Sequence, residues 1–211
     1  MDPDGCLIGD YYNLSGNYIG TDGIDDGKKY LVLDNKEARR IKKTNKAGGT
    51  TQVSEVESAV SVPSDAVVAK MEEAYIETEN KGLEYGFRAG QKHITSLAKG
   101  TDKAIYMAGP EKELREKGEY VTLEAHTHPK GSKKCYGKAE PSDDDMVSAL
   151  STALNVVLGY KPEPVSSTQV TIGQQPNELV RYVCFFNKKG VVGEAINFEI
   201  YKYAVNKINN Q

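Results

Sequence analysis

After residue 62 the chain alternates short apolar segments with helical stretches, and this alternation limits the folds that it can adopt. A helix is predicted from Ser64, a suitable N-cap, to Gly82, a suitable stop, because apolar residues recur between them at i, i+3, i+4 and i+7. Further helices are predicted over 142–154 and 200–208. Strands are predicted over 83–89, 93–97, 104–107, 120–128, 155–159, 169–172, 179–187 and 191–198. Interleaving without strict βαβ order predicts an α/β (α+β) fold, with a mixed β-sheet flanked by helices.

The first 62 residues have a different character. Residues 1–34 are rich in Gly, Asp and Tyr, and their short Tyr-bearing segments between Gly turns predict small β-hairpins. Residues 35–62 carry six Lys and Arg near their start, followed by a Gly-Gly pair, which predicts a polar basic linker. Such a basic run is a solvated spacer or the exposed face of a short helix, or it contacts nucleic acid or an acidic partner. The chain therefore divides into a hairpin region at 1–34, a linker at 35–62 and a packed domain at 63–211.

Charge, hydropathy and cysteine content exclude several classes of protein. Lys and Arg number 27 against 30 Asp and Glu, a net charge of −3, which predicts no nucleic-acid partner bound through a general basic field. No apolar run approaches the ~20 residues of a membrane span, and the acidic start lacks a signal-peptide core. Three widely spaced cysteines, Cys6, Cys135 and Cys184, provide neither a disulfide framework nor a CxxC zinc site.

One segment carries chemistry. His126 and His128 follow an apolar, β-branched run, and residues i and i+2 of a strand face the same side. Pro129 ends the strand, so both imidazoles are expected at a sheet margin. Asp145 follows at the start of a predicted helix. Two imidazoles and one carboxylate form a three-ligand zinc set that leaves a fourth position for water, as catalytic zinc requires.

A structural interpretation of the same residues is also available. A His-x-His pair can face solvent at a strand end, and Ser142-x-x-Asp145 is also a capping box. The three consecutive acids at 143–145 suit a helix N-terminus, and only the spacing from Ser142 favours Asp145 among them. Capping and ligation are compatible, because a capped carboxylate is held rigidly.

The His-Thr-His-Pro motif at 126–129, followed by Pro-Ser-x-x-Asp at 141–145, resembles the signature of the JAMM (MPN-type) zinc metallopeptidases. These hydrolases cleave peptide or isopeptide bonds, notably next to ubiquitin-like modifiers. The resemblance implies a mixed sheet with cytidine-deaminase-like layering. It implies Zn²⁺ bound by His126, His128 and Asp145, with Ser142 helping to stabilise the oxyanion.

The resemblance also implies a general base on an early strand. The best match is Glu84, directly after the first predicted helix, which would take a proton from water and pass it to the leaving amine. The other interpretation of Glu84 is an exposed strand residue. The loop between His128 and Ser142 is longer than usual for the family and is either a solvated insertion or an element that grips substrate or gates the site. Its Cys135 is the alternative fourth ligand, which would silence the metal.

A second resemblance lies at the N-terminus. Asp-Pro-Asp-Gly at 2–5, Gly-Asp-Tyr-Tyr at 9–12 and Gly-Thr-Asp at 20–22 look like the boundary between an Rhs/YD-repeat shell and a variable C-terminal domain. Such bacterial tails are often polymorphic toxins, and a subset carries a JAB-like (JAMM-type) domain. The resemblance implies a metalloprotease effector exported or delivered as the tail of a larger protein. Its partners would be a protein or peptide substrate and an immunity protein, with no nucleic acid and no membrane.

Two other functions compete with this one. A catalytically inactive MPN-like domain would serve as a binding or scaffold module. An amidohydrolase or phosphoesterase barrel would need histidines from several strands, and only His93 remains. A nucleobase deaminase is disfavoured because its H-x-E…P-C-x-x-C signature has no counterpart here.

Overall fold

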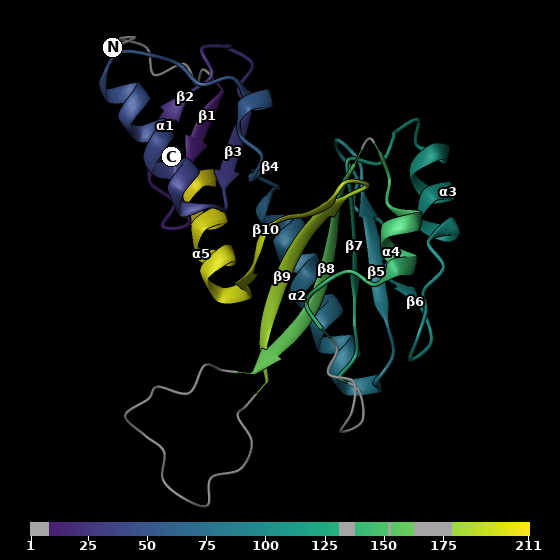
Figure 1. The fold of residues 1–211 in the computed structure, drawn as a ribbon. Coiled ribbons are helices and arrows are strands. Elements are labelled where there is room, and N and C mark those ends of the chain that lie inside the picture. Colours follow the sequence, from purple (N-terminus) through teal and green to yellow (C-terminus); the bar gives the residue numbers. More distant parts are fainter. Residues whose placement is uncertain (1–8, 131–137, 152, 163–178) are drawn as a thin grey trace, which may run out of the picture.

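The computed structural model describes residues 9–130, 138–151, 153–162 and 179–211. In this part of the chain, ten strands form a four-stranded and a six-stranded sheet, with five α-helices packed around them (Figure 1). The predicted mixed α/β class is therefore confirmed. The predicted strand at 169–172 lies outside the described residues.

The six-stranded sheet has the order β10-β9-β8-β7-β5-β6. Its strands are β5 (Tyr85–Ala89), β6 (Ala98–Lys99), β7 (Leu123–Thr127), β8 (Leu154–Pro162), β9 (Leu179–Asn187) and β10 (Gly190–Asn197). All neighbours are antiparallel except β7 and β8, which are parallel. A parallel pair needs a crossover, and here the crossover contains helix α4 (Asp143–Ser148). The chain therefore leaves the sheet at the carboxyl end of β7 and passes through α4 before returning.

Helix α2 (Asp65–Lys81) packs against this sheet and begins and ends where the sequence predicts. The Ser64 hydroxyl accepts a hydrogen bond from the Val67 N–H, and Gly82 adopts the left-handed conformation, with φ 67°. The buried side of α2 includes Tyr75, whose hydroxyl donates to the carbonyl oxygens of Gly159 and Tyr182. These hydrogen bonds attach α2 to β8 and β9, so α2 covers one face of the sheet.

The four-stranded sheet has the order β2-β1-β3-β4. Its strands are β1 (Asp10–Tyr12), β2 (Tyr18–Thr21), β3 (Lys29–Val32) and β4 (Ala59–Ser61). The β1–β2 hairpin agrees with the prediction for residues 1–34, whereas β3 pairs parallel to β1. Residues 35–62, predicted as a polar basic linker, form α1 (Asn35–Lys46), a 3₁₀ turn η1 (Val53–Glu55) and β4, and the basic run is the exposed face of a short helix, one of the two structural alternatives for it.

Helix α1 is apolar on one narrow side only. Ala38 and Ile41 are its buried residues, and they join a small core with Tyr11, Ile19 and Val32. The remaining positions of α1 are polar or charged, so the composition of the segment conceals the helix.

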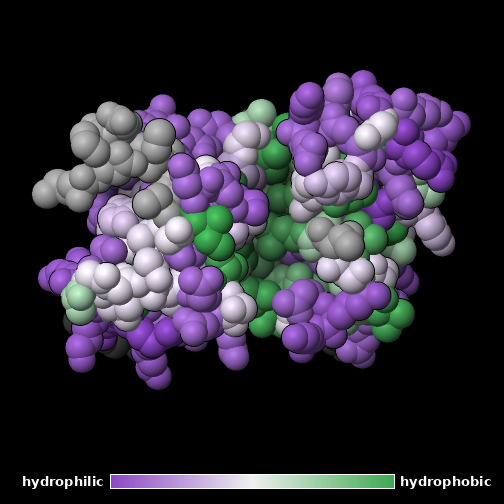
Figure 2. Space-filling view, turned by 90° about the horizontal axis from the view of Figure 1, so that it is seen from above, coloured by the Kyte–Doolittle hydropathy of each residue, from purple (hydrophilic) through white to green (hydrophobic). Residues whose placement is uncertain are grey.

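The two sheets share one hydrophobic core, which α5 (Phe198–Asn209) helps to build. Tyr12 and Leu31 of the small sheet belong to the same buried cluster as Phe198 and Met71. Lys29 also donates from Nζ to the carbonyl oxygen of Ile208, over 2.8 Å. The parts of the chain before and after residue 62 therefore pack together and are not separate units. Figure 2 shows hydrophilic residues over the two ends of the molecule and hydrophobic residues gathered in the hollow between them.

Two further predictions on the edge of the large sheet are wrong. No strand forms over 104–107; the chain runs as a loop into α3 (Ala108–Glu116), which was not predicted. Pro110 lies in the first turn, where its missing N–H has no helical partner to lose. The predicted strand at 93–97 is reduced to a single bridge between Ala89 and Ile94.

Helix α4 is shorter than the predicted 142–154 because Asn155 organises the chain after it. Its side chain accepts from the Leu150 N–H and donates to the carbonyl oxygens of Leu150 and Ala153. This turn replaces the second half of the predicted helix. Within the described ranges, no helix is both long and apolar enough to cross a membrane.

Candidate metal centre

The two histidines of the His-Thr-His motif face the same side of the sheet because Thr127 between them faces the other. The Thr127 hydroxyl accepts from the Tyr85 N–H (2.8 Å), donates to the Tyr85 carbonyl (3.1 Å) and bonds to the Thr78 hydroxyl of α2. Thr127 is fully buried by these contacts. The alternation of a strand then directs His126 and His128 away from α2, as the sequence predicts.

His128 lies one residue beyond β7 and is held by backbone groups. Its N–H donates to the Leu158 carbonyl over 2.9 Å, and its Nδ1 lies 2.9 Å from the Lys138 carbonyl oxygen. A carbonyl can only accept, so Nδ1 carries the proton and Nε2 of the neutral ring remains a free lone pair. That Nε2 lies 3.2 Å from Asp145 Oδ2. The backbone therefore selects the tautomer that a metal ligand needs.

Asp145 reaches the histidines from the first turn of α4. Its N–H donates to the Ser142 hydroxyl (3.2 Å), and its Oδ2 accepts from the Ser142 N–H (2.6 Å). The Ser142 hydroxyl also lies 2.7 Å from Oδ2. The capping box is thus present, and it orients the same carboxylate that approaches the two imidazoles. Asp143 and Asp144 are exposed and take no part in the cluster.

The three side chains form a cluster whose ligand atoms all lie within 4.8 Å of one another. His126 Nε2 lies 3.1 Å from Asp145 Oδ1, yet it is a buried polar atom without a properly aligned hydrogen bond. Buried polar atoms are almost always satisfied, so an unpartnered ring nitrogen here calls for an explanation. A cation between the rings and the carboxylate would provide one. Two imidazoles and a carboxylate fit the three-ligand zinc sites of hydrolases.

The charges of the cluster perturb one another. Burial alone would raise the pKa of Asp145, but its contacts with His126 and His128 hold that pKa well below the usual range. Burial would lower the pKa of His128, and the Asp145 carboxylate outweighs burial, so the pKa of His128 is raised. The carboxylate is therefore ionised and available to a cation across the physiological pH range.

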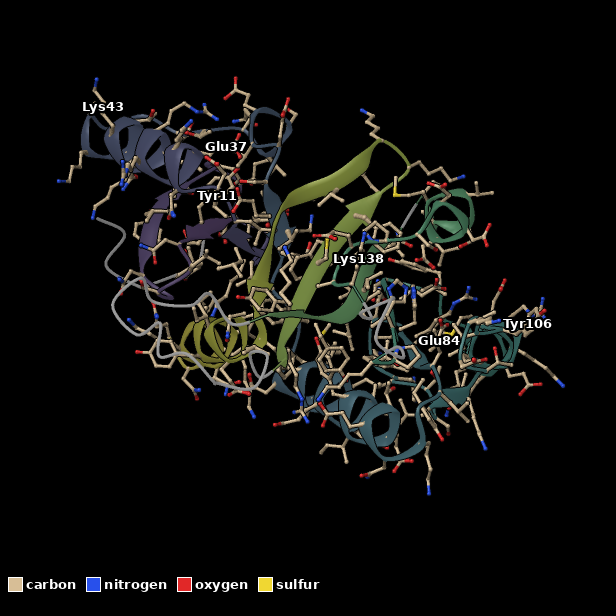
Figure 3. The ribbon with its side chains drawn as sticks, turned by 60° about the horizontal axis from the view of Figure 1, so that its bottom comes forward. Tyr11, Glu37, Lys43, Glu84, Tyr106 and Lys138 are labelled. Atoms are coloured by element: carbon tan, nitrogen blue, oxygen red, sulfur yellow. The ribbon has the colours of Figure 1, made fainter. Side chains whose placement is uncertain are left out.

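Glu84 lies in the same cleft and is not an exposed strand residue. It directly precedes β5, where its N–H donates to the Thr101 carbonyl over 2.7 Å, and only 7% of its surface is exposed. Burial raises the pKa of Glu84, and the nearby imidazoles of His126 and His128 partly oppose that increase. Tyr106 lines the same cleft, and Figure 3 shows both residues on the side of the molecule away from Lys43. A buried carboxylate next to the cluster has the properties of a general base.

The cleft has a volume of about 1030 Å³, and all five predicted site residues line it. Its walls come from the loop before α3, from α4 and from the carboxyl end of β7. Carboxylates dominate the lining: Glu84, Asp102, Glu124, Glu140, Asp143, Asp144 and Asp145, against the cations Arg88, Lys103 and Lys138. Such a space can accommodate an extended peptide segment.

The sequence did not predict one feature of the cleft, an ion pair between Arg88 and Glu124. Arg88 of β5 donates to Glu124 (2.6 Å) and to Glu111 (2.8 Å), and Arg88 and Glu124 are both buried. Glu124 precedes His126 by two residues, and residues two apart in a strand point to the same face, so strand alternation directs Glu124 to the cleft. Its Arg88 partner lies on another strand, in a register that only the structure supplies.

The proposal that Cys135 is a fourth ligand concerns a residue outside the described ranges. Cys184, the one cysteine within them, is buried and is not part of the cluster.

No protein-family model matches the chain, and no curated protein sequence matches it either.

Gly86 supports the metal centre by having no side chain. It pairs with His126 across β5 and β7, and a Cβ atom there would lie 2.8 Å from the Ala125 carbonyl oxygen and 3.0 Å from His126 Cβ. We expect Gly86→Ala to displace His126, to weaken zinc binding about 10- to 100-fold and to destabilise the fold by about 1–3 kcal/mol. Calorimetric titration with zinc and thermal unfolding measure both effects. In the matched control Gly109→Ala, a Cβ meets nothing within 4 Å, and both properties should be retained.

Proposed function

We propose that the chain is a zinc-dependent hydrolase of the JAMM type, a metallopeptidase or isopeptidase. The observation that supports this proposal best is the convergence of His126, His128 and Asp145 around a buried, unpartnered imidazole nitrogen. Glu84, a fourth predicted residue, is buried in the same cleft. If His126, His128 and Asp145 only formed structural ion pairs, there would be no reason for a buried carboxylate such as Glu84 to lie beside them.

His126, His128 and Asp145 would hold the ion. When bound, zinc supplies a Lewis acid that polarises a scissile carbonyl and makes water acidic enough to attack near neutral pH. Glu84 accepts the proton as the water oxygen bonds to the carbonyl carbon. It then delivers that proton to the amine nitrogen as the carbon–nitrogen bond breaks. Ser142 fixes Asp145 through the capping box, and its hydroxyl, which here donates to Asp145 Oδ2, is proposed to redirect that single hydrogen bond to the oxyanion.

The substrate is proposed to be a protein or peptide. We further propose that the domain is the effector tail of a polymorphic Rhs-type bacterial toxin, neutralised by an immunity protein and delivered as part of a longer exported chain. This proposal is supported by the sequence pattern at 2–5, 9–12 and 20–22. An inactive MPN-like binding module would hold the same metal without using Glu84.

Metal removal tests the proposed function. Dialysis against a chelator is expected to abolish hydrolysis of a library of peptides and ε-linked isopeptides, because the three ligands then hold no Lewis acid. Adding one equivalent of zinc should restore the rate, and adding magnesium should not, because imidazole is a poor ligand for magnesium. Hydrolysis that persists in the chelated protein would contradict a zinc mechanism.

A further inference from the structure

Helix α1 presents a row of cations to solvent. Lys36, Arg39, Arg40, Lys43 and Lys46 recur at intervals of three and four residues, so they lie on one side of the helix. All five are exposed, and the buried residues of α1 lie on the opposite side. We call these five residues the α1 cationic stripe. In Figure 3, Lys43 points away from the body at the end of the molecule opposite Glu84.

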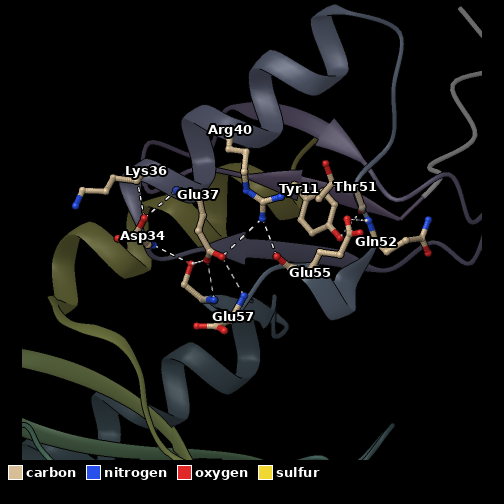
Figure 4. A network of polar contacts seen from close by, with 10 residues as sticks. Tyr11, Asp34, Lys36, Glu37, Arg40, Thr51, Gln52, Glu55 and Glu57 are labelled. Atoms are coloured by element: carbon tan, nitrogen blue, oxygen red, sulfur yellow. Dashed lines mark hydrogen bonds and ion pairs between the residues drawn. The ribbon is translucent and has the colours of Figure 1, made fainter.

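The helix under the stripe is held firmly by its other side. Glu37, the only acid of α1, faces inward and accepts from the N–H groups of Glu57 (3.1 Å) and Ser58 (2.9 Å) (Figure 4). Asp34 caps the helix through the N–H groups of Lys36 and Glu37. Tyr11 donates to the Thr51 carbonyl beneath it. The stripe is thus a preformed surface on a fixed helix.

The stripe has almost no internal counter-charge. Arg40 donates to the Glu55 carbonyl and lies 3.8 Å from Glu37. In the described part of the chain, the other four cations have no acidic group within 4.0 Å. Helix α3 contrasts with α1: its cations alternate with acids, and Lys112 lies 3.7 Å from Glu116.

This arrangement opposes the stability of α1. Like charges three and four residues apart repel each other on a helix surface. Lys36 in the first turn also faces the positive end of the helix dipole, whereas Lys43 and Lys46 in the last turn suit its negative end, so the unfavourable contribution comes mainly from the repulsion along the row. Surfaces that disfavour the fold are commonly maintained for a binding function. The stripe therefore indicates a polyanionic partner.

We propose that the α1 cationic stripe binds the phosphate backbone of duplex DNA. A protein partner would need buried anchors at the centre of the interface, and both apolar residues of α1, Ala38 and Ile41, face inward. Single-stranded nucleic acid is usually bound by stacking its bases on aromatic side chains, and the stripe has none. Duplex DNA needs only cations at a suitable spacing, because release of its counterions provides the binding free energy.

The dimensions of the stripe agree with this ligand. Residues 36 to 46 span about 15 Å of helix. The same length of duplex axis presents about four phosphates on each strand. From the net charge of −3 the sequence predicted no nucleic-acid partner. That sum combines the acids of the cleft with the cations of α1, and these two groups lie at opposite ends of the molecule. The net charge therefore does not describe the charge of the α1 surface.

The test measures binding of the full chain to a fluorescein-labelled 24-base-pair DNA duplex by anisotropy, from 25 to 200 mM salt. We expect the logarithm of the association constant to fall with a slope of about −4 against log salt. The variant Lys36→Ala/Arg39→Ala/Lys43→Ala should bind at least about tenfold more weakly at 50 mM salt, with a slope of about −1. Its melting temperature should not fall, since alanine favours helix and removes repulsion.

The matched control, Lys112→Ala/Arg115→Ala/Lys117→Ala, removes the same charge from α3 and its C-cap residue and should bind DNA like the wild-type chain. Equal weakening of both variants would show a general charge effect and overturn the assignment. So would absence of wild-type binding at 25 mM salt, or tighter binding to the single strand, to an RNA duplex or to a poly-glutamate peptide. The result is independent of zinc and of the proposed hydrolase.

Discussion

Replacing His126 by alanine is expected to reduce bound zinc from one ion per chain to less than about a tenth of that. The substitution removes one of three ligands and leaves two groups that bind zinc weakly. Asp145→Ala should have the same effect, because its carboxylate is the only oxygen ligand of the cluster. Elemental analysis after dialysis against buffer containing micromolar zinc measures the stoichiometry, and circular dichroism verifies that each variant is folded.

His93→Ala provides the matched control. His93 is exposed, it contacts Glu119 through Nδ1, and it lies outside the metal-binding group. Its loss should leave the zinc content unchanged. A His126→Ala chain that is folded and still holds as much zinc as the wild-type chain would overturn the assignment of the centre.

Replacing Glu84 by glutamine should lower the hydrolytic rate constant by about 10²- to 10⁴-fold, the usual contribution of a general base. Glutamine keeps the size and the burial of the side chain but cannot accept a proton. Zinc content should be retained, since Glu84 is not among the ligands. Rates on the best peptide or isopeptide of the library, measured together with metal content, separate the loss of the base from the loss of the ion.

Glu140→Gln is the control for this variant. Glu140 lines the same cleft and pairs with Lys161 over 3.2 Å, away from the metal-binding group. It should retain the wild-type rate. A Glu84→Gln chain that keeps both zinc and the full rate would refute the role of Glu84. Zinc binding without any hydrolysis by the wild-type chain would favour the scaffold function instead.

Local signals explain which parts of the fold the sequence predicts. Ser64 and Gly82 mark both ends of α2 by cap chemistry that acts within a few residues. The Lys-Lys-Gly turn at 188–190 similarly marks the β9–β10 hairpin. The apolar side of α1 is only two residues wide, so the sequence left a solvated spacer and a short helix as alternatives there, and α3 was not predicted.

The orientations of His126, His128 and Asp145 were predictable because each residue has a local geometric reason for its position. Strand alternation places His126 and His128 together, and the capping box selects Asp145 from three consecutive acids. The convergence of these residues depends on the β7–α4–β8 crossover, which spacing alone does not specify. The Arg88–Glu124 pair requires the register of β5 against β7, a long-range property that no short motif encodes.

The core shared by the two sheets has a consequence for how this chain can diversify. A recombination that exchanged only residues 63–211 would combine α5 with a small sheet shaped for a different helix, and side chains such as Tyr12 and Leu31 would lose their packing partners. A protease that cut between the sheets would likewise expose apolar surface without releasing an intact folded fragment. The region from the first strand to the last helix must therefore be inherited, exchanged and expressed as one piece.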